Sequence, residues 1–135
     1  LHDIGHFVSV NGHHRHSWYL INSSPFVGLS VRDKSIVAAV ARYHRKAPPS
    51  TDHAEFSALE ASDRRVVLQL AAILRVADAI DSEHSGDVPN VSFQLKNESF
   101  RLSMGRNGDS QLECWSVIKK GRLFEEVFGR KLVVK

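Results

Sequence analysis

The sequence is poor in the features that mark secreted, membrane-spanning and nucleotide-binding proteins. It has one cysteine, Cys114, in 135 residues, which excludes a disulfide framework and favours a reducing, cytoplasmic setting. It has no apolar run close to the about 20 residues that a membrane span needs, and no signal peptide. It also lacks a Gly-rich phosphate loop, since "GRNGD" is typical of a hairpin turn.

The residues that are present predict a folded domain with a basic first half. Hydrophobic residues make up 42% of the chain, enough for a packed core and too many for a disordered protein. Because the chain begins with Leu1 rather than Met, we interpret it as a fragment. Its basic, His-rich half favours a polyanion such as a nucleotide, polyphosphate or nucleic acid, with an ordinary solvated surface as the alternative. The cationic residues of that half are Arg15, Arg42, Arg45 and Lys46.

Helical periodicity dominates the first part of the chain. A short helix is predicted over 16–24, where Pro25 follows, and a longer one over 30–46, with Ser30 as N-cap and two prolines beyond it. A third helix is predicted over 64–84. Its broad apolar stripe is typical of a helix buried inside a bundle. The members of that stripe are Val66, Val67, Leu70, Ile73, Leu74, Ala77 and Ile80.

Beyond "SGDVPN" the apolar residues no longer recur at helical spacing but at every second position. Strands are predicted over 91–95 and 100–104 with "KNES" between them, and a third at "QLEC". A helix over 115–128 ends at Gly129, and "KLVVK" is a last strand. The expected fold is therefore mainly α with a small α+β lobe. We expect a helical domain over 1–86 and the lobe over 87–135.

Imidazole and carboxylate groups gather in a pattern that suits a metal ion. His2 and Asp3 are adjacent, and Asp78 lies in the apolar run "ILRVADAI", where a carboxylate is costly without a cation or hydrogen-bond donors. Such ligands suit Mn, Fe, Zn or Mg. Two alternatives stay open: that each histidine has only a surface role, and that Asp78 only accepts hydrogen bonds from Arg42 or Arg75.

"LHDIG" and the later "VADAID" resemble the HD-domain phosphohydrolase superfamily. The resemblance implies a metal set of a His, the His2–Asp3 pair and Asp78. Two-metal members add two histidines, which here would be His13, with His14 or His16 as rivals, and His44. The first His of the superfamily pattern has no counterpart in this chain.

A narrower resemblance covers nearly the whole chain. "GHHRHSWYLI", "ARYHRKAPP", "LAAILRVADAIDSEHSG" and "LFEEVFGRKLVV" resemble the C-terminal region of the exopolyphosphatase / guanosine pentaphosphate phosphohydrolase (Ppx/GppA) family. The resemblance implies an HD-like helical bundle followed by a short antiparallel sheet with one helix. It places the main catalytic residues in N-terminal lobes, upstream of Leu1. The C-terminal region would assist polyphosphate binding and form a homodimer.

Three functions follow as hypotheses. In the first, the chain is an accessory module that binds polyphosphate or guanosine pentaphosphate through Arg15, His16, Arg42, His44, Arg45 and Lys46. In the second, it is a metal-dependent phosphohydrolase, in which His2, Asp3, Asp78 and an upstream His would hold a divalent ion. His13 or His44 would hold a second ion or stabilise the leaving oxygen, and without the upstream His we expect the chain alone to be inactive. In the third, it is a structural oligomerisation module. Neither a membrane nor nucleic acid is the expected partner, and the sequence leaves the preferred phosphate substrate open.

Overall fold

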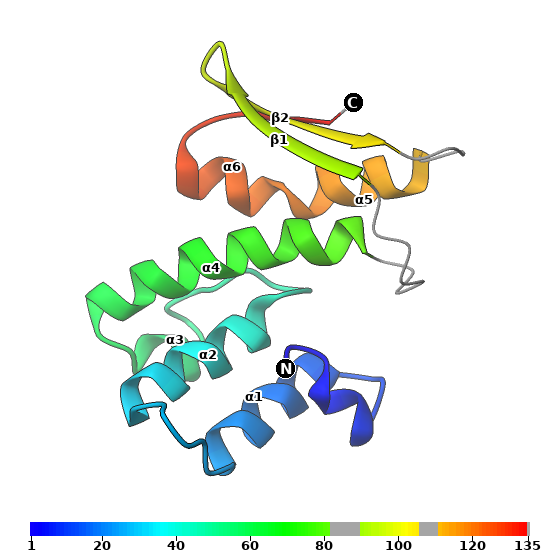
Figure 1. Ribbon diagram of the computed structural model, residues 1–135. Helices are drawn as coiled ribbons and strands as arrows, with labels where there is room; N and C mark the ends of the chain where they lie inside the picture. Colours follow the sequence, from blue (N-terminus) through cyan, green and yellow to red (C-terminus); the bar gives the residue numbers. More distant parts are fainter. Residues whose placement is uncertain (82–89, 106–110, 135) are drawn as a thin grey trace. The chain divides into compact units, whose positions relative to one another are not determined.

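The computed structural model describes residues 1–81, 90–105 and 111–134. The fold is mainly α with a small α+β lobe, which confirms the predicted class (Figure 1). The chain divides into two compact units, Leu1–Ala71 and Ala72–Lys135, which are described separately as the first and second unit. The domain boundary predicted after residue 86 lies outside the described residues. None of the described helices is both long and apolar enough to cross a bilayer.

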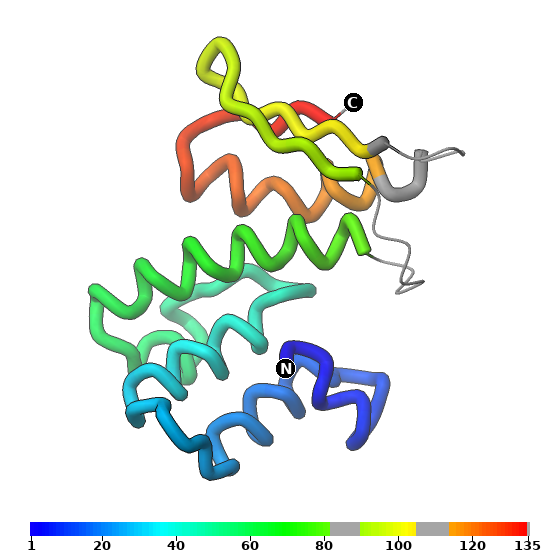
Figure 2. The backbone as a smooth tube through the Cα atoms, viewed as in Figure 1, coloured from blue at the N-terminus to red at the C-terminus, as the bar shows by residue number. Residues whose placement is uncertain are grey.

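The first unit is a set of helices whose chain path can be followed in Figure 2. Ser30 caps its second long helix as predicted, because its hydroxyl accepts the backbone N–H of Asp33 at 3.0 Å. Two helices begin earlier than predicted. One begins at His13 rather than at residue 16, and another begins at Ala61 rather than at residue 64. The elements are η1 (Ile4–Phe7), α1 (His13–Ser23), α2 (Val31–Tyr43), α3 (Ala54–Ser57) and the first part of α4 (Ala61–Ile80).

Small residues let the helices of the first unit approach closely. Ala38 and Ala41 of α2 pack with Ile21 of α1, and Ile4 of η1 adds to this core. Arg32 ties α2 to the start of α4, since its Nε and Nη2 donate to the carboxylate of Asp63 at 2.6–3.0 Å. This packing fixes η1, α1 and α2 relative to one another.

The apolar stripe predicted for α4 is wrong in part. Val66, Leu70 and Ile73 are exposed, and the buried side carries small residues together with Val67 and Val76. Alanine allows close packing, so small residues form much of the buried face, and only some of the predicted large side chains lie on it. The buried small residues of α4 are Ala71, Ala72 and Ala79.

The second unit places helices against a mixed sheet, which corrects the expected antiparallel sheet with one helix. β1 pairs antiparallel with β2, but β2 pairs parallel with β3, because the helices between them bring the chain back in the same direction. "QLEC" is not a strand and belongs to a helix. Besides the end of α4, the elements are β1 (Asn90–Lys96), β2 (Ser99–Gly105), α5 (Gln111–Lys120), α6 (Arg122–Phe128) and β3 (Leu132–Val134).

The helix expected over 115–128 is broken at Gly121. A Cβ atom there would lie 2.7 Å from the Val117 carbonyl oxygen and 2.8 Å from a methyl carbon of Leu132. Glycine therefore allows β3 to pass close to the junction of α5 and α6. Gly129 ends α6 in the left-handed region (φ 65°), as predicted.

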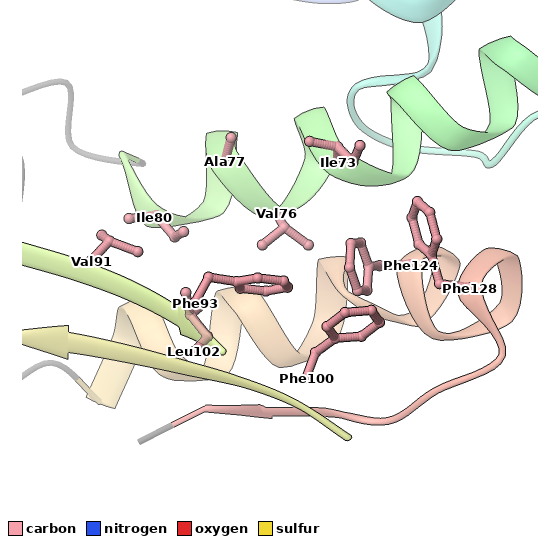
Figure 3. A pocket seen from close by; sticks show the side chains of 10 residues that line it. All are labelled: Ile73, Val76, Ala77, Ile80, Val91, Phe93, Phe100, Leu102, Phe124 and Phe128. Atoms are coloured by element: carbon pink, nitrogen blue, oxygen red, sulfur yellow. The ribbon is translucent and has the colours of Figure 1, made fainter. Parts of the chain in front are cut away.

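Aromatic rings form the interior of the second unit. Phe100 and Phe124 have ring centroids 5.2 Å apart, and the Phe124 and Phe128 centroids are 4.5 Å apart. Beside the rings lies an apolar cavity of about 410 Å³ (Figure 3), which is open to solvent, since Ile73 and Phe93 in its lining are exposed. The cavity is lined by Ile73, Val76, Ala77, Ile80, Val91, Phe93, Phe100, Leu102, Phe124 and Phe128.

Candidate metal centre

The turn that carries the His2–Asp3 pair is fixed to α1 by backbone contact. The Gly5 N–H donates to the Ser17 hydroxyl at 2.9 Å, and that hydroxyl donates to the His2 carbonyl at 2.6 Å. A Cβ atom on Gly5 would lie 2.0 Å from the His13 carbonyl oxygen. Only glycine allows this approach, and the approach holds Asp3 over the start of α1.

Two buried histidines point the same ring nitrogen toward each other. His13 Nδ1 lies 3.1 Å from the Val10 carbonyl oxygen, and His44 Nδ1 lies 2.7 Å from that of Ala41. A carbonyl only accepts, so each Nδ1 carries the proton and each Nε2 of a neutral ring keeps its lone pair. The two Nε2 atoms are 3.3 Å apart.

Asp3 closes this arrangement with a carboxylate oxygen. Its Oδ1 lies 3.3 Å from His13 Nε2 and 3.5 Å from His44 Nε2. Its Oδ2 lies 3.1 Å from Nε2 of His2. When the rings are neutral, the two facing nitrogens and Oδ1 are all acceptors, so a cation among them is favoured.

His6 is a further member of the cluster that the sequence analysis missed. Its Nε2 lies 3.7 Å from Asp3 Oδ1, and its ring centroid is 3.8 Å from that of His13. The signal was present in the sequence, since His6 follows Asp3 by three residues, one turn of the 3-10 helix η1. Ligand atoms of Asp3, His6 and His13 lie within 4.8 Å of one another.

The electrostatics of the cluster favour neutral imidazoles. Burial is the largest influence on His13 and lowers its pKa; the bond to Val10 raises it, while His6 and Arg45 lower it further. Burial, and then the charge of Arg42, lowers the pKa of His14 to about 4. A neutral ring is the form that binds a metal, so these residues fit a divalent ion.

The donor set indicates which ions suit the site. One carboxylate oxygen and up to three imidazole nitrogens, from Asp3, His6, His13 and His44, suit Zn, Fe, Ni or Mn better than Ca or Mg. Of the three candidate histidines of α1, His13 is the one whose Nε2 lies beside Asp3. His14 is buried with its ring edge-on to His13, and His16 is half-buried.

Asp78, the remaining predicted ligand, belongs to the second unit. Its carboxylate accepts from the Lys120 ammonium at 2.5 Å. Its charge also acts on Arg75, whose pKa is lowered by burial and raised by Asp78, so the alternative of a purely structural role for Asp78 stays open. Whether Asp78 joins the histidine cluster stays a prediction.

Residues 1–117 match the family model described as Ppx/GppA phosphatase, domain III. The chain belongs to the Ppx/GppA phosphatase family. The match includes the whole histidine cluster, and it ends within α5, so that α6 and β3 lie beyond it.

The cationic side chains of this Ppx/GppA domain have different surroundings. Arg42 is buried, its Nε donates to Glu55 at 3.0 Å, and its Nη1 is buried without a hydrogen-bond partner among the described residues. Arg45 and Lys46 are exposed directly after His44. Arg15 and Arg42 border a groove of about 480 Å³, whose other members are Trp18, Tyr19, Asp52, His53, Ala54 and Glu55.

Burial and Arg42 act in opposite directions on Glu55. Burial raises its pKa, but backbone and Arg42 hydrogen bonds outweigh burial, so the net pKa is lowered. The Arg42–Glu55 pair therefore stays ionised at neutral pH. The guanidinium of Arg42, which the sequence predicts to bind a polyanion, is therefore already paired with one carboxylate.

Proposed function

We propose that this chain is a metal-holding, polyanion-binding domain of a Ppx/GppA phosphatase. The terminal phosphoanhydride of polyphosphate or guanosine pentaphosphate would be hydrolysed by residues of other lobes, and the domain would also form a homodimer. The observation that carries the metal proposal is the convergence of Asp3 Oδ1 with His13 Nε2 and His44 Nε2 at 3.3–3.5 Å.

Asp3, His13 and His44 would hold the ion, with His6 or His2 beside them. A bound divalent ion supplies a fixed positive charge that polarises a phosphoryl oxygen and lowers the pKa of water. The carbonyls of Val10 and Ala41 hold the two buried rings in the tautomer that a metal needs. These residues therefore provide a prearranged site.

Arg45 and Lys46 extend the positive charge beyond the metal ligands. Both side chains are exposed, and the charge of Arg45 already lowers the pKa of His13, which indicates that it acts on the cluster. A polyphosphate chain has one negative charge per phosphate, so it would bind through several weak, salt-sensitive contacts. Arg15 and His16 of α1 are the next residues that this contact would include.

Metal analysis of the purified chain tests the first part of the proposal. We expect Zn²⁺ or Mn²⁺ to bind, measured by titration calorimetry. His13→Ala and His44→Ala should each weaken binding by about 10- to 100-fold, whereas His16→Ala, a half-buried histidine of the same helix, should not. Equal affinity in all four proteins would refute the assignment.

Polyphosphate titration at two salt concentrations tests the second part. Affinity should fall as salt rises, and Arg45→Gln with Lys46→Gln should weaken it and flatten the salt dependence. Arg65→Gln is the matched control, because Arg65 is an exposed cation on α4. Binding that is insensitive to salt, or equally weakened by the control, contradicts the proposal.

Hydrolysis by the domain itself is the second candidate function, because the same three ligands are the kind that metal-dependent phosphohydrolases use. Release of phosphate from polyphosphate by the chain in Mn²⁺ would support it. That activity should disappear with chelator and in His44→Ala. Activity that survives both treatments would come from a contaminant and not from this site.

A further inference from the structure

β1 lies at the edge of the three-stranded sheet and is longer than β3. The strand order is β1-β2-β3, and β1 pairs with β2 over all seven of its residues. Within the described parts of the chain, no strand pairs with its other side. In an edge strand, alternate backbone N–H and C=O groups point away from the sheet and are available to another strand.

This edge has few of the features that prevent pairing. The register with β2 is continuous, without a bulge, and the strand contains no proline and one charge, Lys96, at its end. Its apolar residues are exposed: Val91 by 41%, Phe93 by 48% and Leu95 by 56%. Figure 3 shows Val91 and Phe93 on the side that lines the apolar cavity. A continuous, apolar edge of this kind is suited to strand addition.

The sequence of β1 is complementary to itself. "NVSFQLK" reads polar–apolar–polar–apolar–polar–apolar–polar and is symmetric about Phe93. In an antiparallel pair centred on Phe93, Val91 of one copy lies opposite Leu95 of the other. By the same symmetry Ser92 meets Gln94, Asn90 meets Lys96, and the two Phe93 rings face each other. No like charges meet, and apolar residues meet only apolar residues.

We propose that β1 is a homodimer interface, at which two copies of the chain pair edge to edge and form one six-stranded sheet. A two-fold axis through Phe93 makes the interface isologous. A shift by one residue would turn one copy's apolar side chains to the opposite face, so the alternation selects this register. The inference rests on the homodimer proposed above and names its surface; it does not depend on the metal or on polyphosphate.

Paired charge substitutions on the polar face test this interface without touching the aromatic core. Ser92 and Gln94 are exposed, and in the proposed pair each faces the other residue of the second copy. Ser92→Glu with Gln94→Glu places like charges opposite each other, whereas Ser92→Lys with Gln94→Glu places opposite charges there. Both pairs put a glutamate at 94, which faces Arg101 within the sheet, so both variants should fold.

Analytical ultracentrifugation of the 135-residue chain over a range of concentrations measures the dimer dissociation constant. We expect a dimer for the unchanged chain, a dimer weakened about tenfold or more in the Glu/Glu pair, and a dimer in the Lys/Glu pair. Circular dichroism checks that both variants are folded. A dimer that neither pair affects, or that both pairs disrupt, overturns the β1 surface alone; a monomer throughout overturns the homodimer as well.

Discussion

The two units bury different kinds of side chain. Among its described residues, the first unit buries His13, His14 and His44, together with the polar groups of Arg42 and Tyr43. The second unit buries leucine, valine and phenylalanine, and the buried Phe124 contacts Phe100 edge-on and Phe128 at a tilt. Buried imidazoles gain little from leaving water and require partners, whereas buried phenylalanine gains directly. The first unit therefore holds buried polar groups that depend on specific partners, whereas the second unit is stabilised mainly by apolar burial.

The partners of the buried polar groups support this division. In the first unit backbone carbonyls orient the histidines, and the Tyr43 hydroxyl lies 3.1 Å from His53 Nδ1. Burial raises the pKa of Tyr43 to about 12, so the phenol stays neutral. In the second unit Glu125 has a structural role, because its carboxylate accepts the Leu132 N–H at 2.8 Å and fastens β3 to α6.

The largest effect is expected from removing a ring of the second unit. Phe124→Ala should lower the free energy of unfolding by about 3–5 kcal/mol, because the lost ring touches Phe100 and Phe128 and enlarges a cavity that already exists. Urea denaturation measures the loss. Hydrogen exchange should quicken in β1 and β2 and remain slow in α1 and α2. Equal acceleration in both units would show that they unfold as one.

Gly5→Ala is the corresponding destabilising substitution in the first unit. The added methyl group would collide with the His13 carbonyl oxygen and the Ser17 nitrogen, at 2.0 and 2.6 Å, so we expect a loss of about 3 kcal/mol and detachment of Asp3 from α1. Gly12→Ala is the control. Gly12 has φ +72° and open space around it, so alanine there should cost only about 1 kcal/mol. Similar losses in the two variants would exclude close packing as the cause.

Much of this fold is predictable because local signals dominate it. The Ser30 cap and the Gly129 stop are set by neighbouring residues alone, and the sequence predicts both. "QLEC" was misassigned because four residues with alternating character do not separate a strand from the first turn of a helix. The parallel pairing of β3 depends on the helices that precede it, which a local pattern does not contain.

For the candidate site, the sequence predicts the kinds of ligand, imidazole and carboxylate, better than it predicts which histidines lie beside Asp3. The pairing of Asp3 with His13 and His44 was expected from resemblance, but the choice of His13 over His14 and His16 depends on where α1 begins. His6 is not predictable from apolar periodicity, because its proximity to Asp3 depends on a single 3-10 turn. The ion pair of Arg42 with Glu55 is not predictable either, because the two residues are 13 positions apart and no periodicity links them.

Metal addition should stabilise the first unit and leave the second unchanged, and this effect is smaller than the two above. If the cluster binds Zn²⁺, an ion concentration 100-fold above the dissociation constant would stabilise the first unit by about 2.7 kcal/mol. Hydrogen exchange should then slow around His13 and His44 but not in β1 and β2, and chelator should reverse the change. His13→Ala should remove the effect and His16→Ala should retain it. Slowing that is equal in β1 would contradict a site confined to the first unit.

The smallest effect is expected from the Arg32–Asp63 pair, which joins two helices of the first unit. Hydrogen bonds from Arg32 lower the pKa of Asp63 below its usual 3.8, although loss of solvent acts in the opposite direction. A carboxylate with a lowered pKa in the folded state contributes stability above its unfolded pKa and loses it as the pH falls through the folded value. Asp63→Asn should therefore destabilise the chain at pH 7, and the difference from the unchanged protein should shrink below pH 3.8.

Urea midpoints measured from pH 7 to pH 2 test this dependence on Asp63. Arg32→Gln should produce the same change in the pH profile, and the double variant should lose little more than either single one, because both remove one interaction. Losses that add in full would mean that the two side chains act separately. The second unit offers the parallel test, since the Leu132 N–H and Lys131 lower the pKa of Glu125. Glu125→Gln should weaken β3 at pH 7, and the difference from the unchanged protein should shrink as the pH falls below 4.5, while the exchange of α2 stays unchanged.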